Sequence, residues 1–298
     1  MSTILVTGAT GFIGQHLTRA LVTAGHEVRA MTRRPESYDG PGEAVGADVA
    51  DPAAVRAALA DVEVAYYLVH SLADLDFERK DADAARVFAE AAADAGTGQI
   101  VYLGGLGADD QQLSSHLRSR REVETLLAAS GVPVTVLRAA VVVGDGGISW
   151  EITRQLVKNL PAMVVPRWAR TLTQPIALED VVRYLVGVAG EERALGRTFE
   201  IGGPDRVSYL DMLRIAAEVE RGRPVPILPV PVLTPRLSSY WLALVTDVDV
   251  TTGRNLIDSM GTEVLVTDHA IREIVPGEPI GYADAVRRAL DERRRRLA

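Results

Sequence analysis

The chain has 298 residues, of which 47% are hydrophobic and 24% are charged, and this balance excludes a disordered or fibrous protein. Its formal net charge of −8 argues against a nucleic-acid partner, which requires a clustered excess of lysine and arginine. It contains no cysteine, which excludes disulfides and thiolate metal sites, and its five histidines lack metal-ligand spacing, so we expect no metal.

Short apolar runs alternate with segments of helical periodicity through the first 145 residues. Apolar runs of strand length occur at residues 3–7, 27–33, 44–49, 62–69, 99–106 and 133–144. Helical segments occur at residues 12–25, 51–60 and about 74–95, and another begins within 113–124. Six strands with helices between them predict an α/β fold with a doubly wound parallel sheet, the Rossmann fold.

The pattern changes after Gly144. The later elements are expected to be helices at 149–161 and 208–222, a strand at 197–203, and an extended proline-rich connector at 223–235. We therefore predict a first domain of residues 1–145 and a smaller mixed α/β region of residues 146–298. The second region is expected to return to the main sheet between 174 and 203, near Phe199.

No run of the sequence reaches the roughly 18 apolar residues that a membrane helix requires. The first residues, MSTILVTGATGFIG, have no basic region before the apolar run and differ from a signal peptide. The basic run Arg293–Arg296 is typical of a solvated helix tail. We therefore expect a soluble cytoplasmic protein without a membrane partner.

The segment TGATGFIG follows the first expected strand and opens the first expected helix. It spaces Gly8, Gly11 and Gly14 so that the chain can turn sharply, admit a phosphate and pack the helix closely. Free amides at the start of the helix attract negative charge. The residues expected to bind the diphosphate of a dinucleotide are Gly8, Thr10, Gly11, Phe12, Ile13 and Gly14.

The end of the second expected strand indicates which nicotinamide dinucleotide is bound. No acidic residue stands there to bind ribose hydroxyls, whereas Arg33 and Arg34 can bind an additional phosphate. This favours NADP, and NAD is the alternative if the two arginines only decorate a surface loop. Asp48 and Val49 are placed to contact adenine, unless Asp48 only solvates a helix end. His70 is placed to line the nicotinamide side, unless it is an ordinary loop residue.

With these motifs the chain resembles the short-chain dehydrogenase/reductase superfamily, in the extended or atypical branch that includes the NmrA-like proteins. The resemblance covers most of the chain and is carried by TGATGFIG, GADVAD, VYLGGLG, VTVLRAAVVVG, TQPIALEDVV and TFEIGGPDRVSYLDML. It implies a Rossmann domain that binds NAD(P) and a later region that binds a small-molecule substrate. In active members, a Tyr-x-x-x-Lys pair on the helix after the fifth strand supplies the acid and holds the nicotinamide ribose.

The segment LSSHLRSRREVE, aligned on Glu124, places His116 at the tyrosine position and Arg120 at the lysine position. The resemblance thus implies that His116 and Arg120 are catalytic, with a changed chemistry, because Arg120 stays protonated and favours neutral His116. His116 would donate a proton only if its charged form survives beside Arg120, and otherwise it caps or packs its helix. The position that usually carries serine or threonine is Gly104 or Gly105.

These features favour an NADP-dependent oxidoreductase that transfers hydride to a small apolar, enone or quinone-like acceptor. Such acceptors depend less on an acidic tyrosine than ketones do, and the cofactor carries the chemistry. The alternative is a non-catalytic NmrA-like protein that binds NADP as a redox sensor. A weaker alternative, a sugar-nucleotide epimerase or dehydratase, is disfavoured because that chemistry uses the missing tyrosine to deprotonate a hydroxyl.

Overall fold

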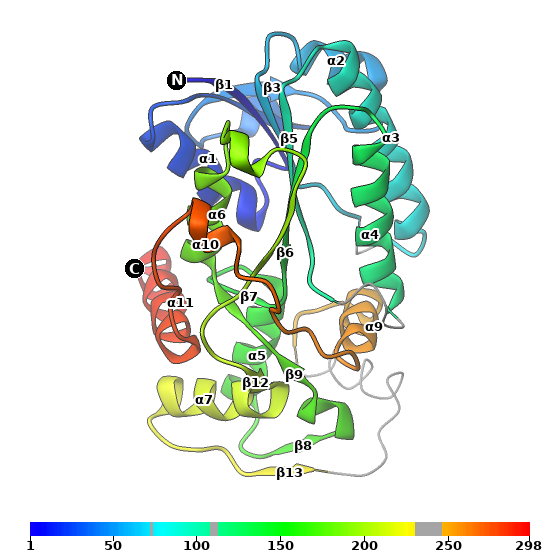
Figure 1. Ribbon diagram of the computed structural model, residues 1–298. Helices are drawn as coiled ribbons and strands as arrows, with labels where there is room; N and C mark the ends of the chain where they lie inside the picture. Colours follow the sequence, from blue (N-terminus) through cyan, green and yellow to red (C-terminus); the bar gives the residue numbers. More distant parts are fainter. Residues whose placement is uncertain (72–73, 108–112, 230–245) are drawn as a thin grey trace.

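Seven parallel strands form the main sheet of the computed structural model, which describes residues 1–71, 74–107, 113–229 and 246–298 (Figure 1). Their order across the sheet is β11-β6-β5-β4-β1-β2-β3. The strands are β1 Thr3–Thr7, β2 Glu27–Thr32, β3 Glu43–Gly46, β4 Val64–Tyr67, β5 Gln99–Gly105, β6 Val134–Ala139 and β11 Thr198–Ile201. The chain order reverses between β1 and β4, and doubly wound sheets bind ligands at that point, beyond the carboxyl ends of the strands. The predicted fold class is confirmed.

Helices cover both faces of the main sheet (Figure 1). The helices on one face are α1 Phe12–Thr23, α6 Leu178–Gly187 and α10 Ile271–Ile274, and those on the other are α2 Pro52–Ala58, α3 Phe77–Asp94 and α4 Ser115–Ala128. Successive residues of a strand point to opposite faces, so in β1 Ile4 and Val6 pack with α1 and α6 while Leu5 packs with α2 and α3. All three are fully buried, which explains why this central strand is uninterruptedly apolar.

The later elements gather at one end of the main sheet, where α5, α7 and α11 share a core that includes Trp150, Leu213 and Val286 (Figure 1). These helices are α5 Ile148–Asn159, α7 Tyr209–Arg221 and α11 Tyr282–Leu297. Short strands pair as β7 Val142–Val143 with β10 Ile176–Ala177, β9 Leu172–Thr173 with β12 Val207–Ser208, and β8 Met163–Val165 with β13 Ile227–Pro229. The remaining elements are α9 Val250–Ser259 and the 3-10 helices η1 Pro35–Ser37, η2 Arg167–Arg170 and η3 Glu192–Ala194. No helix in these described ranges has the length and apolar character to cross a membrane.

Two expected strands differ from those observed. The strand predicted at 133–144 is two strands: β6 ends at Ala139, and β7 pairs with β10 outside the main sheet. The break is set by tertiary hydrogen bonds, in which the Ile176 amide donates to the Val141 carbonyl and the Leu106 amide to the Ala139 carbonyl. The strand predicted at 44–49 ends at Gly46. The proline-rich connector contains β13, and its residues 230–235 lie outside the described residues.

The arginine run at the end of α11 is not merely a solvated tail. Arg296 Nε lies 2.7 Å from Asp145 Oδ2, and Arg293 Nη1 lies 3.1 Å from Asp145 Oδ1. The side chain of Asp145 is only 3% exposed, and Arg293 also contacts Glu151 Oε1 at 3.1 Å. Burial alone would raise the pKa of Asp145, but hydrogen bonds from Arg296 and Arg293 hold that pKa below its ordinary value. This ion-pair cluster attaches α11 to the segment between β7 and α5.

Candidate functional site

The glycine-rich segment between β1 and α1 forms a turn that only small residues fit. Gly8 has a φ of 65°, in the left-handed region that glycine adopts without strain. A Cβ on Gly14 would come 2.1 Å from the Gly8 carbonyl oxygen, so the start of α1 lies directly against the turn. Gly11 precedes α1 and supplies no side chain to cap it. The first amides of α1 therefore retain their donors for an anion, and the segment fits the diphosphate of a dinucleotide.

A pocket of about 270 Å³ opens beside this turn, at the carboxyl edge of β1, β4, β5 and β6. This is the position at which doubly wound sheets bind ligands. Its lining combines the glycine turn with apolar and ionisable side chains. The lining residues are Gly8, Gly11, Phe12, Ile13, Gly14, Leu68, His70, Tyr102, Leu103, Gly104, Gly105, His116, Arg120, Ala139, Ala140, Val142, Gly147, Ile148, Ser149 and Leu256.

The structure brings most of the expected site residues together in this pocket. Those that line it are Gly8, Gly11, Phe12, Ile13, Gly14, His70, His116 and Arg120. Within the described chain, Thr10, Arg33, Arg34, Asp48 and Val49 are not part of its lining. The pocket therefore unites the expected diphosphate loop with the expected catalytic pair.

The residues expected to select the cofactor lie at the ends of β2 and β3. Arg33 and Arg34 are exposed and directly follow β2, the neighbour of β1. The carboxylate of Asp48 already accepts a hydrogen bond from the Ala50 amide at 2.9 Å, whereas Val49 packs against the core beneath α2 and α3. The two arginines are thus available to a ligand, while Asp48 has a local structural partner.

Arg120 is a buried cation at the wall of the pocket. Its side chain comes from α4, the residue is 9% exposed, and Nη1 donates a hydrogen bond to the Tyr102 hydroxyl at 3.4 Å. Asp81 on α3 acts on Arg120 electrostatically. Across the described residues, however, no carboxylate forms an ion pair with Arg120. A buried charge without a paired partner is costly, so this guanidinium is suited to an anion or an oxygen supplied by a ligand.

His116 occupies the same helix one turn earlier and is half-buried. Burial, together with the charges of Arg120 and His70, lowers the pKa of His116 to about 3. The imidazole is therefore neutral at physiological pH. The condition for proton donation by a charged His116, survival of the imidazolium beside Arg120, is not met at that pH.

Packing leaves no room for a side chain at Gly104 and Gly105, and therefore none for a hydroxyl. A Cβ on Gly104 would lie 2.6 Å from Glu124 Oε1, and one on Gly105 would lie 2.7 Å from Leu117 Cδ2. Glu124 is fixed there because Arg138 donates to its Oε2 at 2.7 Å. Of the nearby serines, Ser114 caps α4 by accepting a hydrogen bond from the Leu117 amide. The hydroxyl that orients a carbonyl in typical short-chain dehydrogenases has no space at these glycines.

Sequence reasoning missed several residues of the pocket. Tyr102 could have been predicted, because it lies in the carboxyl half of β5, two residues before Gly104. Ile148 and Ser149 begin α5 and follow a glycine-rich stretch that could have marked a ligand-contacting turn. Leu256 comes from α9, far along the chain, and no local pattern indicated its position.

Comparisons with known proteins agree with a dinucleotide-binding fold. A family model described as NAD(P)H-binding matches residues 8–169, more than half of the chain. A reductase of Streptomyces griseus, which acts on (4-alkanoyl-5-oxo-2,5-dihydrofuran-3-yl)methyl phosphate, is 30% identical over 236 residues, covering 74% of this chain and 75% of that protein. The ceramide reductase of Caulobacter vibrioides is 28% identical over 235 residues, covering 74% of this chain and 71% of that protein.

An uncharacterised protein of Mycobacterium tuberculosis is 31% identical over 241 residues, covering 80% of this chain, and the chain spans only about a quarter of that protein's length. Among solved structures, the Citrobacter triphenylmethane reductase with NADP(H) superposes with a TM-score of 0.78 at 17% identity, covering 96% of this chain and 99% of that one. The latter likeness shows the fold. The chain belongs to the NAD(P)H-binding Rossmann family, in agreement with its resemblance to atypical short-chain dehydrogenases/reductases.

Proposed function

We propose that the protein is an NADP-dependent reductase of small apolar acceptors in which a carbon–carbon double bond is conjugated to a carbonyl, such as enones and quinones. The observation that carries this proposal is Arg120. It is a buried guanidinium without an ion-pair partner among the described residues, and it lies at the pocket that adjoins the diphosphate loop. Such a group stabilises negative charge that develops on a bound oxygen.

Reduction of a conjugated acceptor develops charge at a place that suits this pocket. When bound, NADPH supplies a hydride, which adds to the carbon at the end of the conjugated system. The electron pair of the double bond then moves onto the carbonyl oxygen, which becomes an enolate oxygen. Arg120 hydrogen-bonds this oxygen and stabilises its charge, and water returns the proton that completes the two-electron reduction.

A neutral His116 suits the reduction of conjugated acceptors better than the reduction of simple ketones. Ketone reduction needs a proton at the oxygen as hydride arrives, and a histidine with a pKa of about 3 holds no such proton at neutral pH. Its neutral ring can still accept or donate one hydrogen bond to orient the acceptor. The apolar wall formed by Leu68, Leu103, Ile148 and Leu256 fits a flat hydrocarbon ring.

The preference for NADP rests on Arg33 and Arg34. Both are exposed directly after β2, the neighbour of β1 in the sheet, and a pair of guanidinium groups is suited to a ribose phosphate. NAD is the alternative cofactor if the arginines do not contact it.

The acceptor class is supported by the Streptomyces relative. Its name describes an oxo-dihydrofuran, which is an unsaturated ring.

The test is oxidation of NADPH by the purified chain against a panel of quinones, cyclic enones and matched saturated ketones. We expect turnover with the conjugated acceptors and little with the ketones. An Arg120→Met protein should lose roughly 10²- to 10³-fold in kcat/KM and keep its affinity for NADPH. Arg118→Met is the matched control, because Arg118 lies on the same helix, is exposed and is outside the pocket.

A second function is favoured by two features of the described pocket. His116 is neutral at physiological pH, and Gly104 provides no hydroxyl. A protein that binds NADPH tightly and reduces none of these acceptors would be a redox sensor. That result would overturn the reductase proposal, as would full activity of Arg120→Met.

A further inference from the structure

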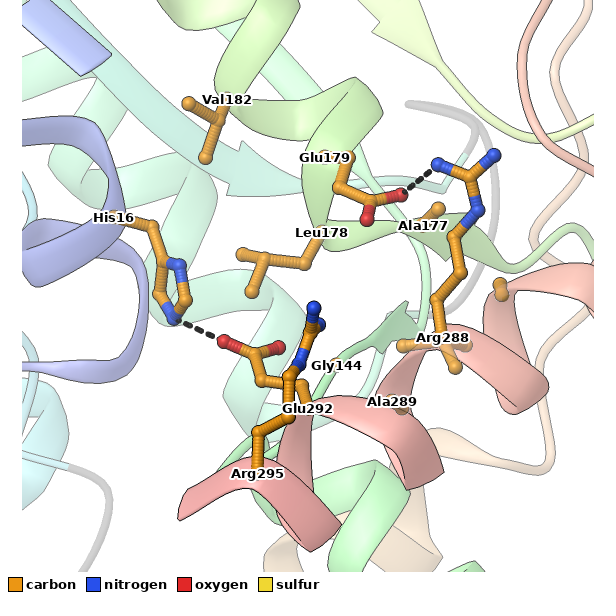
Figure 2. Close-up of a pocket in the computed structure, with 12 residues that line it drawn as sticks. His16, Gly144, Ala177, Leu178, Glu179, Val182, Arg288, Ala289, Glu292 and Arg295 are labelled. Carbon is orange, nitrogen blue, oxygen red and sulfur yellow. Dashed lines mark hydrogen bonds and ion pairs between the residues drawn. The ribbon is translucent and has the colours of Figure 1, made fainter. Parts of the chain in front are cut away.

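A second pocket, of about 320 Å³, lies between α1, α6 and α11, apart from the nucleotide pocket (Figure 2). Its volume is at the lower end of the range for small-molecule sites. One part of its lining is aliphatic, and another part carries ionisable groups. The lining residues are His16, Val143, Gly144, Ala177, Leu178, Glu179, Val182, Ala285, Arg288, Ala289, Glu292 and Arg295.

The pocket carries two carboxylates and two guanidinium groups, and one carboxylate has a close guanidinium partner. Arg288 Nη1 contacts Glu179 Oε2 at 2.9 Å, which forms one wall (Figure 2). Glu292 Oε1 lies 3.7 Å from His16 Nε2, beyond hydrogen-bond distance. Burial lowers the pKa of His16 although Glu292 opposes this, so the ring is neutral at pH 7 and does not neutralise Glu292. Within the described ranges, Arg295 has no ion-pair partner.

Glu292, whose contact is a His16 ring that is mostly neutral, and Arg295 therefore present one weakly paired negative charge and one positive charge to the same cavity. They are three residues apart on α11, so their side chains leave the helix on the same face. An ammonium and a carboxylate borne on one carbon atom require one anionic acceptor and one cationic donor in the same cavity. The aliphatic part of the lining, which includes Leu178 and Val182, would receive an apolar side chain.

We propose that this pocket binds a small zwitterion of the α-amino acid class with an aliphatic side chain. The ammonium group pairs with Glu292, the carboxylate pairs with Arg295, and the side chain packs on Leu178. A simple carboxylate or a simple amine satisfies one of the two charges and leaves the other unpaired.

Phe12 and His16 lie between this pocket and the nucleotide pocket, so a ligand in one pocket would affect binding in the other. Phe12 lines the nucleotide pocket, and its ring is packed edge-on against His16 with a centroid distance of 6.3 Å. A Cβ on Gly144 would lie 3.1 Å from the Phe12 ring, and one on Gly147 would lie 2.7 Å from it. Gly144 lines the amino-acid pocket and Gly147 lines the nucleotide pocket. A ligand that shifts His16 or Gly144 would press on the Phe12 ring, so we expect binding at the two sites to be coupled.

The test of the site is calorimetric titration of the full chain with L-leucine, in the absence of nucleotide. We expect saturable binding of one L-leucine per chain, with 4-methylpentanoate and 3-methylbutylamine at least tenfold weaker. Glu292→Gln and Arg295→Gln should each weaken L-leucine binding at least tenfold. Arg294→Gln is the matched control, because Arg294 is on the same helix and pairs with Asp291 outside the pocket.

Absence of saturable binding up to the solubility limit of L-leucine would overturn the proposal. Equal binding of either analogue, or unchanged binding by both pocket variants, would overturn it as well. This titration does not depend on the proposed reductase function. The coupling does rest on nucleotide binding, and it predicts that saturating L-leucine changes the Kd for NADPH at least threefold. By reciprocity, NADPH must change the Kd for L-leucine by the same factor, and an unchanged Kd would overturn the coupling.

Discussion

Arg120 donates a hydrogen bond to the Tyr102 hydroxyl across 3.4 Å, a distance longer than that of most hydrogen bonds between nitrogen and oxygen. This is weak compensation for burying a guanidinium. Asp81, the nearby acid, is itself buried, and its Oδ1 accepts a hydrogen bond from the Ser71 backbone amide at 2.7 Å. Burial lowers the pKa of Arg120, but Tyr102 and Asp81 raise it above its ordinary value, so the charge persists. The α4 helix therefore holds a permanent charge at the pocket without an ion-pair partner among the described residues, which is typical of a group kept for binding or catalysis.

The first prediction is that Arg120→Met increases stability while it slows the proposed reduction. An apolar side chain of similar length fills the space and removes the desolvated charge, so the free energy of unfolding should rise by about 1 kcal/mol or more. Urea unfolding followed by circular dichroism measures this change. A decrease of comparable size would show that Arg120 has stabilising partners that outweigh its burial.

The second prediction concerns pH and His116. The pKa of His116 is about 3 in the folded protein and about 6.5 in the unfolded chain, so the unfolded chain binds more protons between these values. This residue therefore lowers the stability of the folded state progressively as pH falls below 6.5. His116→Gln should lose less stability than the wild type between pH 6.5 and 4.5. Because His16 and His70 titrate in both proteins, the difference between the two unfolding curves isolates His116, and parallel curves would contradict the assignment.

The sequence predicted the doubly wound sheet because its signals are local. The runs of residues 3–7 and 99–106 and the turn at Gly8 each depend on neighbours within a few positions. The break after Ala139 was missed because residues 139–144 are almost continuously apolar, and hydrogen bonds from Leu106 and from distant β10 divide them. Pairing between distant segments decides such cases, and local periodicity does not contain it.

The candidate site divides in the same way. The diphosphate loop and the His116–Arg120 pair could be found because spacing along one turn and one helix fixes their geometry. Leu256 reaches the pocket only through the packing of α9, so no spacing rule identified it. The unpaired state of Arg120 likewise depends on residues from several elements around it. The residue types of the site and their spacing were predictable. The burial that changes the pKa values of these side chains was not.

The third prediction is that a hydroxyl cannot be restored at Gly104. Gly104→Ser places a Cβ 2.6 Å from Glu124 Oε1 and 3.2 Å from Tyr102 Cε1, so the strand or the Glu124–Arg138 pair must shift. We expect the free energy of unfolding to fall by about 1–3 kcal/mol, with no gain in ketone reduction. Gly104→Ala is the matched control and should lose a similar amount, since the clash is at Cβ. Stability equal to that of the wild type would show that Glu124 moves aside at little cost.

The fourth prediction concerns the ion-pair cluster that attaches α11 to the loop before α5. Asp145→Asn removes the charge that receives Arg293 and Arg296, and should lower the free energy of unfolding by about 1–3 kcal/mol at pH 7. Because the pKa of Asp145 is lowered, its stabilising effect is present at neutral pH and is lost as pH falls through that lowered value. The loss in Asp145→Asn should thus shrink in strongly acidic buffer.

The loop adjacent to Asp145 supplies Gly147 to the nucleotide pocket and leads into α5, which supplies Ser149, so the same variant should also raise the KM for NADPH. A double-mutant cycle with Arg293→Gln separates the pair from other effects of either change. Additive losses would show that Asp145 and Arg293 act independently.

The fifth prediction tests which nicotinamide dinucleotide the protein prefers. If Arg33 and Arg34 bind the ribose phosphate, Arg33→Ala/Arg34→Ala should weaken NADPH binding at least tenfold, because hydrogen bonds to a charged group are each worth about 1.5–3 kcal/mol. NADH, which lacks that phosphate, should bind both proteins equally. Arg86→Ala on α3 is the matched control, since Arg86 is exposed and pairs with Asp83 away from both pockets. Calorimetry with the two nucleotides measures the four affinities, and equal losses for NADPH and NADH would place the arginines outside the phosphate site.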